Sequence, residues 1–199
     1  MKLLMSPPSP FARKVRVLLR EVDLLDRVAE QQVSTSPLNS APDALAANPL
    51  GKIPALLRDD GPALYDSRVI TRYLNDLAGA KLYPDSSLYE VLTLEATADA
   101  IMEATVAMTY EVRLRPEAQQ SDDWIQAQWA KAARAIAAID ARWMSHLHGP
   151  LNMAQIAVSC ALAYVDLRHG DRDWRDGNDA LAAWQATYEA RDAMQATKP

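Results

Sequence analysis

The chain has 199 residues, of which 49% are hydrophobic and 24% are charged, and its formal net charge is −5. This composition excludes an intrinsically disordered chain and allows one large or two small domains with a buried core. The acidic balance argues against nucleic acid as the main partner, because phosphate binding needs a basic field, and no apolar run has the length of a membrane span.

The first eighty residues alternate strand and helix signals. A short apolar run over 2–5 predicts a buried strand, and the Ser-Pro-Pro turn that ends it leads into an amphipathic helix. Further along we expect a strand over 27–33, a loop over 34–50 with one helical turn, a strand over 53–58, a hairpin partner over 63–65 and a helix capped by Asp66-Ser67. The order is β-α-β, loop, β-β-α, and it ends near Gly79.

After residue 85 the strand signals disappear and alanine becomes frequent. Residues 86–114 predict one long helix, and a second begins near Ser121 with apolar residues at spacings of three and four. A third begins at Asn152, where Asn152 and Gln155 form a candidate capping box, and a fourth covers 179–194. We therefore expect a first domain over 1–78, a linker over 78–86 and an all-helical domain over 86–199.

Three short motifs follow one another in the first half of the chain. They are Ser9-Pro10-Phe11 followed by RKVR, the segment NPLGKIP over 48–54, and Asp66-Ser67 followed by Ile70 and Tyr73-Leu74. With the element order, they resemble a bacterial cytosolic glutathione transferase of the serine type, and the resemblance covers nearly the whole chain. It implies an α/β thioredoxin-like N-terminal domain, an all-α helical C-terminal domain, glutathione as co-substrate and a homodimer.

Ser9 stands where the resemblance implies the group that holds the glutathione sulfur. A helix N-terminus presents unpaired N–H groups and a positive dipole end, so it stabilises an anion such as a thiolate. Lowering a thiol pKa of about 8.5 by about two units requires about 2.7 kcal/mol, the size of one charge-assisted hydrogen bond plus a helix end. Two alternatives stay open: Ser9 is only an N-cap, or Ser6 contacts the sulfur instead.

The other two motifs are expected to hold the tripeptide. The resemblance implies a cis Ile53–Pro54 bond, with the Ile53 backbone pairing the cysteinyl residue like an added strand. Lys52 would neutralise the glycyl carboxylate, while Ser67 and Asp66 would hold the γ-glutamyl end at a helix start. The alternatives are an edge-strand proline with a solvated lysine, and a plain helix cap. The residues expected to bind glutathione are Phe11, Lys52, Ile53, Pro54, Asp66, Ser67 and, across a dimer interface, Asp99.

The second substrate is expected against the first long helix of the helical domain. In the family this site lies between the domains, and methionine suits a loose apolar pocket. The alternative is that the same Met and Ala stripe packs in the helical core. The candidate positions are Met102, Thr105, Met108, Thr109 and Arg113.

The single cysteine and the three histidines predict no further chemistry. Cys160 lies among apolar residues and is expected to be buried, and one cysteine excludes an intrachain disulfide and fits a reducing cytoplasm. The histidines show no metal spacing and are expected at the surface, so no metal site is predicted.

The predicted reaction is attack of the glutathione thiolate on a small apolar electrophile. The lack of cysteine near residues 6–11 disfavours disulfide-exchange and related chemistry that needs a protein thiolate. Two other functions remain open: a non-catalytic binding protein of the same fold, and a glutathione-dependent peroxidase or isomerase using the same site.

Overall fold

The computed structural model describes residues 1–199 and divides into two compact units. One unit contains Met1–Pro84 together with Arg191–Pro199, and the other contains Asp85–Ala190. The first is an α/β unit and the second is all-helical, which are the two kinds of domain that the resemblance implied.

A three-stranded sheet organises the α/β unit, in the order β2-β1-β3. Strand β1 runs parallel to β2 and antiparallel to β3, with Leu4 opposite Ala55. The expected hairpin partner over 63–65 is reduced to a single bridge between Leu64 and Leu56. The elements of this unit are β1 (Lys2–Met5), α1 (Pro10–Glu21), β2 (Ala29–Gln32), α2 (Pro42–Ala47), β3 (Ala55–Leu57), α3 (Ser67–Ala78) and α9 (Asp192–Gln195).

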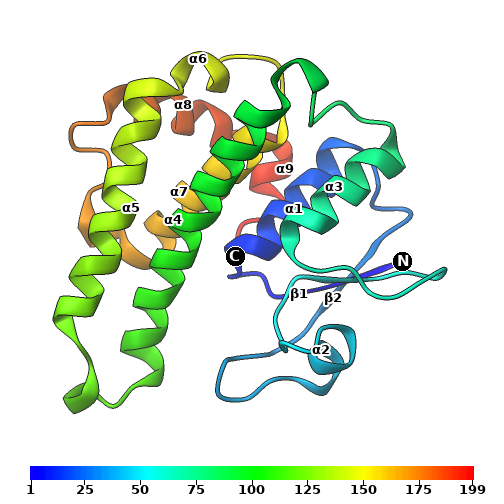
Figure 1. Cartoon of the computed structure of the whole chain (residues 1–199), viewed down its shortest axis with the longest axis horizontal. Coiled ribbons are helices and arrows are strands. Elements are labelled where there is room, and N and C mark those ends of the chain that lie inside the picture. The colour runs from blue at the N-terminus through cyan, green and yellow to red at the C-terminus, as the bar shows by residue number, and fades with distance from the viewer. The chain divides into compact units, whose positions relative to one another are not determined.

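Helices cover both faces of this sheet (Figure 1). Helices α1 and α3 pack together on one face, and α2 packs against β3 on the other. Of the apolar face of the first helix, Val15, Leu18 and Leu19 are fully buried because they pack in the core, whereas Phe11 and Val22 at the two ends are partly buried. On the α2 side, Leu4, Val33, Ala47 and Ala55 form a small core cluster. Strands β1 and β3 are therefore largely buried, whereas β2 is partly exposed along its length.

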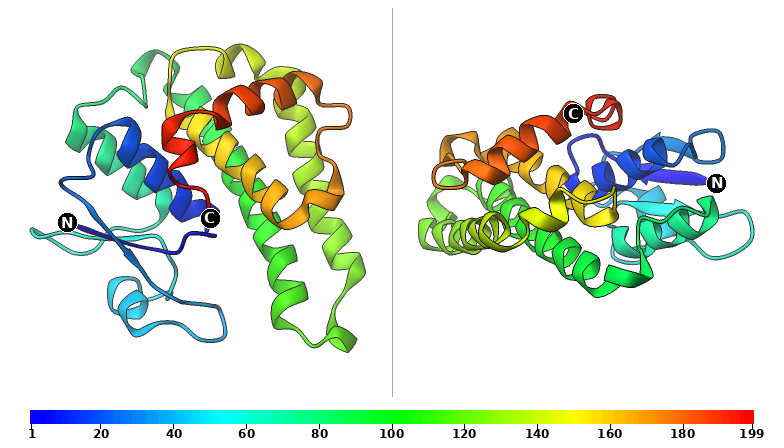
Figure 2. Two further views of the ribbon diagram at one scale, coloured as in Figure 1. Left: turned by 180° about the vertical axis from the view of Figure 1, so that it is seen from behind. Right: turned by 90° about the horizontal axis from the view of Figure 1, so that it is seen from above.

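Three long helices, α4, α5 and α7, make up most of the helical unit and lie side by side (Figures 1 and 2). The sequence predicted their starts well: Ser121 caps α5, and Asn152 and Gln155 form the expected capping box of α7. None of the helices is long and apolar enough to cross a membrane. The helices are α4 (Leu88–Leu114), α5 (Asp122–Arg142), α6 (Met144–Leu147), α7 (Met153–His169) and α8 (Asp179–Glu189).

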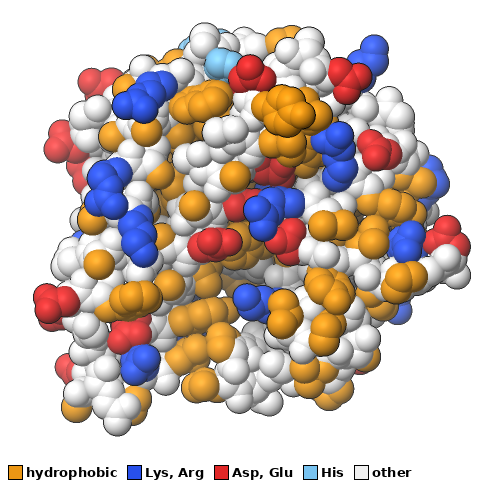
Figure 3. All heavy atoms as spheres, viewed as in Figure 1, with side chains coloured by type: hydrophobic (Ala, Val, Ile, Leu, Met, Phe, Trp, Pro, Cys, Tyr) orange, Lys and Arg blue, Asp and Glu red, His pale blue; other side chains and the backbone are white.

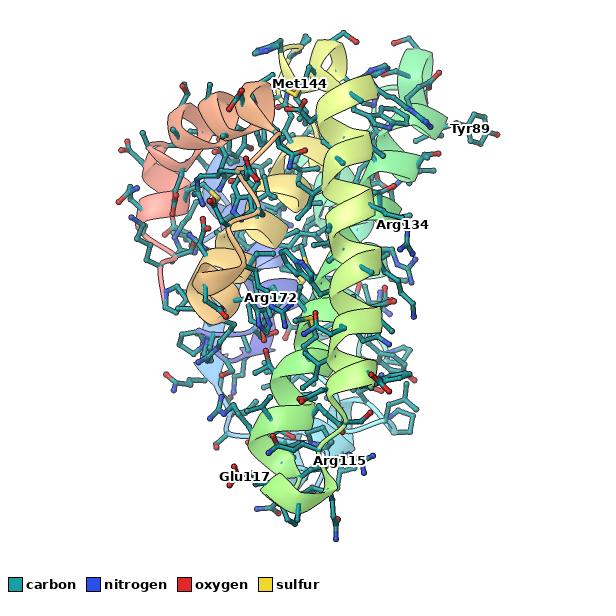
Figure 4. The ribbon with its side chains drawn as sticks, turned by 90° about the vertical axis from the view of Figure 1, so that its left-hand side faces the viewer. Tyr89, Arg115, Glu117, Arg134, Met144 and Arg172 are labelled. Atoms are coloured by element: carbon teal, nitrogen blue, oxygen red, sulfur yellow. The ribbon has the colours of Figure 1, made fainter.

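The surface of the helical unit carries mixed charges. Figure 4 shows Arg115 and Glu117 at the turn that joins α4 to α5, Met144 at the opposite end of α5, and Tyr89 projecting away from α4. On the face in Figure 3, acidic, basic and hydrophobic side chains are interspersed. That face therefore has no large patch of side chains of a single charge sign.

The helix predicted over 179–194 is correct as far as Glu189 but is interrupted after that residue. Helix α8 ends at Glu189, Arg191 is extended, and the short α9 follows. Residues 191–199 then belong to the α/β unit and not to the helical domain in which the sequence analysis placed them. The physical reason is long-range: the Arg191 guanidinium donates two hydrogen bonds to the Glu21 carboxylate at 2.8 and 2.7 Å, a contact that no local pattern encodes.

Candidate functional site

Ser9 closes the N-terminus of α1 directly after β1. The Ala12 N–H donates to Ser9 Oγ at 3.3 Å, and the Ser9 N–H donates to the Ser6 carbonyl at 3.0 Å. The capping role is thus present. A hydroxyl that accepts one hydrogen bond still has its own proton to donate, so the cap leaves Ser9 able to donate to an anion. The first turn of α1 contains no acidic residue, which leaves its positive end uncompensated.

The loop over 48–52 is shaped by hydrogen bonds from a buried asparagine. Asn48 Nδ2 donates to the Lys52 carbonyl at 3.1 Å, and Asn48 Oδ1 accepts from the Leu50 N–H at 3.0 Å. Gly51 has a φ of +64°, and a Cβ there would lie 2.6 Å from Ser40 Oγ. These contacts hold the loop in one shape and leave the Lys52 side chain exposed.

A threonine that the sequence analysis did not single out supports the same loop. Thr35 Oγ1 donates to the Gly51 carbonyl at 3.2 Å and accepts from the Ala41 N–H, the residue that precedes α2. Thr35 therefore joins the start of α2 to the glycine turn. It lies in a Ser/Pro-rich loop without periodicity, so no local signal identified it.

The Ile53–Pro54 bond is cis, as the resemblance implied. The β1–β3 ladder begins at Ala55, opposite Leu4, so the Ile53 backbone lies outside that ladder. Continuing the same register places Ile53 opposite Ser6. The Ile53 N–H and C=O thus stand at the strand end beside the turn that leads to Ser9.

The N-terminus of α3 carries charged groups of both signs. Asp66 caps the helix, with Oδ1 accepting from the Arg68 N–H and Oδ2 paired with the Arg68 guanidinium, each at 3.0 Å. Burial raises the pKa of Asp66, but the Arg68 hydrogen bond and charge, helped by Lys14, outweigh it and hold that pKa below its usual value. Asp66 is therefore ionised at neutral pH, while the next residue, Ser67, is buried at the first position of the helix.

The strand topology brings the three motifs to one end of the sheet. Ser9 follows the carboxyl end of β1, and Ile53 precedes the amino end of the antiparallel β3. Both residues therefore lie at the same end of the sheet. Leu64 forms an antiparallel bridge with Leu56 of β3, so the chain that continues from Leu64 to Ser67 runs back to the same end of the sheet. Neighbouring strands lie about 4.8 Å apart, so three adjacent segments span about 10 Å, the length of an extended tripeptide.

The candidates on the helical unit are mostly interior. The side chains of Met102, Thr105, Met108 and Thr109 are buried, whereas Arg113 is exposed near the end of α4. Asp99 is also buried on α4. A pocket of about 210 Å³ lies between the first turns of α4 and residues 145–154, and none of these candidates lines it.

Thr105 and Thr109 take part in a hydrogen-bond cluster between α4 and α7. Tyr164 Oη donates to Thr109 Oγ1 at 3.2 Å, and His169 Nε2 lies 2.9 Å from the Thr105 carbonyl and 3.2 Å from Thr109 Oγ1. Because a carbonyl oxygen only accepts, Nε2 carries the proton. Burial lowers the pKa of His169 below its usual value, although the bond to Thr105 opposes this. His169 is thus a neutral donor between two helices.

The expected surface position was wrong for His169. His146 and His148 are exposed, but His169 is half-buried because it lies four residues after the fully buried Val165, on the same face of α7. Cys160 is fully buried, as predicted. No group of three or more His, Cys, Asp or Glu side chains is placed to hold a metal ion.

Comparisons with known proteins agree with this geometry. Residues 8–77 match the family model of the glutathione S-transferase N-terminal domain, and residues 122–185 match that of the C-terminal domain. The chain is 30% identical to the uncharacterized GST-like protein YibF of Escherichia coli K12, covering 100% of this chain and 98% of YibF.

Two solved structures of bacterial relatives contain glutathione. A glutathione transferase family member from Pseudomonas fluorescens Pf-5 is 43% identical, with a TM-score of 0.97 over 100% of this chain and 98% of that one. A glutathione S-transferase from Methylobacillus flagellatus KT is 36% identical, with a TM-score of 0.85 over 100% and 98% of the two chains. With the two matched domains and the full-length relative, these likenesses establish that the chain belongs to the glutathione S-transferase family.

Proposed function

We propose that this protein is a glutathione transferase that binds glutathione in extended form along the end of its sheet. The observation that carries the proposal is the meeting of the Ser9, Ile53 and Ser67 segments at one sheet edge, at a spacing that suits a tripeptide. The bound glutathione in two full-length relatives supports the same ligand.

Ser9 is proposed to activate the sulfur. Its hydroxyl accepts from the Ala12 N–H and donates its own proton to the thiolate, at a helix end that carries no acidic residue. A charge-assisted hydrogen bond together with the helix dipole is worth about 2–3 kcal/mol, which lowers a thiol pKa by about two units. Ser6 is the alternative donor, since its carbonyl is engaged by Ser9 but its hydroxyl has no assigned role.

The remaining motif residues are proposed to hold the tripeptide. The Ile53 backbone, fixed by the cis bond to Pro54, would pair with the cysteinyl residue, and the exposed Lys52 would neutralise the glycyl carboxylate. The ionised Asp66 would bind the γ-glutamyl ammonium group, and the α3 N-terminus at Ser67 its carboxylate. Phe11 would pack beside Ser9 as part of the same motif.

The proposed chemistry is nucleophilic conjugation. The thiolate sulfur forms a bond to an electrophilic carbon of a small apolar molecule, and the leaving group departs with its bonding electrons. Of the residues proposed for the second-substrate site, only Arg113 has an exposed side chain that could contact the substrate directly. The buried candidates would support this part of α4 from the interior; they are Met102, Thr105, Met108 and Thr109. We further propose a homodimer in which Asp99 assists the γ-glutamyl end.

Titration of the bound thiol tests the proposal. Thiolate absorbance of bound glutathione is measured against pH in the wild type, in Ser9→Ala and in the matched control Ser6→Ala. We expect a bound pKa about two units below that of a free thiol, raised in Ser9→Ala and unchanged in Ser6→Ala.

The other outcomes identify the competing functions. Binding of glutathione without a pKa shift would support a non-catalytic member of the family. Faster turnover of a hydroperoxide than of a conjugation substrate would support a peroxidase. A rise in pKa in Ser6→Ala alone would transfer the role to Ser6.

A further inference from the structure

Residues 191–199, which we name the C-terminal strap, lie along α1 in the α/β unit (Figure 2). At one end of the strap Arg191 pairs with Glu21, in the last turn of α1. At the other end Thr197 contacts Arg13, in the first turns of the same helix. The strap is therefore antiparallel to α1 and spans it from its last turn to the turn that follows Ser9.

The contacts at the Arg13 end are buried, and they join the charged guanidinium to uncharged acceptors. Arg13 is only 4% exposed, and its guanidinium donates to the Met194 carbonyl at 3.1 Å and to Thr197 Oγ1 at 3.4 Å. Thr197 is fully buried, and its hydroxyl donates in turn to the Ala193 carbonyl at 2.9 Å. A buried guanidinium N–H without an acceptor is costly, so Thr197 fixes where this arginine can lie.

The Thr197 backbone makes a second contact with α1. Arg16 Nη1 donates to the Thr197 carbonyl at 3.3 Å, while Arg16 Nε is paired with Glu30 on β2 at 3.0 Å. Thr197 therefore contacts two successive turns of the helix, and through Arg16 it is connected to the sheet. The strap holds the first half of α1 more firmly than a single contact would.

One backbone turn of α1 links the contacts of Thr197 to Ser9. The Arg13 N–H donates to the Ser9 carbonyl at 2.9 Å, so Arg13 belongs to the turn that Ser9 caps. A displacement of Arg13 displaces the Ser9 hydroxyl, and hydrogen-bond strength falls steeply with distance and angle. We propose that Thr197 is a positioning residue for Ser9, so that activation of the bound thiol depends on the last residues of the chain. This inference rests on the proposed function of Ser9.

The opposite end of the strap provides a matched control. Glu21 lies twelve residues from Ser9, or about 18 Å along the helix. Glu21→Gln weakens the pair with Arg191 and loosens the strap without touching the first turn of α1. If the C-terminal strap only stabilised the fold, weakening either of its ends would have the same effect on the pKa of the bound thiol.

The experiment compares the bound thiol pKa in Thr197→Val, Thr197→Ser and Glu21→Gln, with thermal unfolding of each variant. We expect Thr197→Val to raise the pKa by about half a unit, which lowers the thiolate fraction about threefold below that pKa. Thr197→Ser keeps the hydroxyl and should restore the wild-type value. Glu21→Gln should lower the unfolding temperature without changing the pKa.

Each result decides a different point. If the wild type shows no lowered thiol pKa, the proposed function fails and the inference fails with it. If the wild type shows the shift and Thr197→Val does not change it, only the inference fails. Should Thr197→Val not fold, Arg13→Lys serves instead: it keeps the charge but replaces the planar guanidinium, whose Nε and Nη2 donate separately to Thr197 and Met194, and it is expected to raise the pKa of the bound thiol equally.

Discussion

The N-termini of α1 and α3 reach the same end of the sheet, but different groups cap them. Ser9 caps α1 with a neutral hydroxyl, and no acidic side chain follows in the first turn. Asp66 caps α3 with a carboxylate that is already paired with Arg68. The positive end of α1 is therefore left for an incoming anion, whereas the end of α3 offers both signs of charge. This difference supports the proposed placing of the thiolate at the first helix and of the zwitterionic γ-glutamyl end at the second.

Exchanging the type of cap at α1 should have the largest effect. Ser9→Asp keeps a good N-cap, so the unfolding free energy should change by less than about 1 kcal/mol. The new carboxylate repels the thiolate and donates no proton, so the thiol pKa should no longer be lowered. We expect kcat/KM for conjugation at neutral pH to fall about 100-fold, in proportion to two lost pKa units.

The measurement is steady-state conjugation kinetics alongside chemical denaturation of the same samples. If Ser9→Asp keeps its activity, the electrostatic difference between the two helix ends does not control the pKa of the bound thiol. Loss of activity together with loss of folding would leave Ser9→Ala as the deciding comparison.

The loop between the two helix ends should give an intermediate effect. Gly51→Ala places a methyl group 2.9 Å from Ser40 Cβ at a φ of +64°, whereas Gly79→Ala has a similar φ of +61° and nothing within 4 Å. Backbone strain alone costs about 1 kcal/mol, so Gly79→Ala should lose about that much and Gly51→Ala about twice as much.

Denaturation of the two alanine variants gives this difference directly. Isothermal titration with glutathione should show weaker binding in Gly51→Ala only, because Gly51 is next to Lys52. Equal losses of stability in both variants would mean that Ser40 moves aside and that the loop is not held as tightly as its contacts suggest.

The smallest effect concerns the charge on Asp66. Because the pKa of Asp66 is lowered in the folded protein, its contribution to stability is present above the unfolded pKa of about 3.9 and is lost as the pH falls through the lower folded value. The unfolding temperature of the wild type should therefore fall more steeply than that of Asp66→Asn below about pH 4. Parallel curves would show that the exposed pair with Arg68 contributes nothing to stability.

Helix starts were predictable because their signals are local. Ser121, Asn152 and Asp66 each act within three residues of themselves, so the sequence shows both the cap and the N–H that it satisfies. The same holds for Ser9 and for burial of Cys160 within an apolar helix. The three motifs at the sheet end were also readable in their order along the chain.

Contacts between distant segments were not predictable in this way. Helical periodicity continued through residue 190, yet the pairing of Arg191 with Glu21 across 170 residues accompanies a break there and places α9 on α1. The hydrogen bond of His169 to the Thr105 carbonyl joins residues that lie 64 positions apart in the chain. The amino-acid sequence alone determined which residues cap which helices, because capping hydrogen bonds join residues that are close together in the chain. Which distant side chains meet was settled by packing, because those contacts form only when the whole unit has folded.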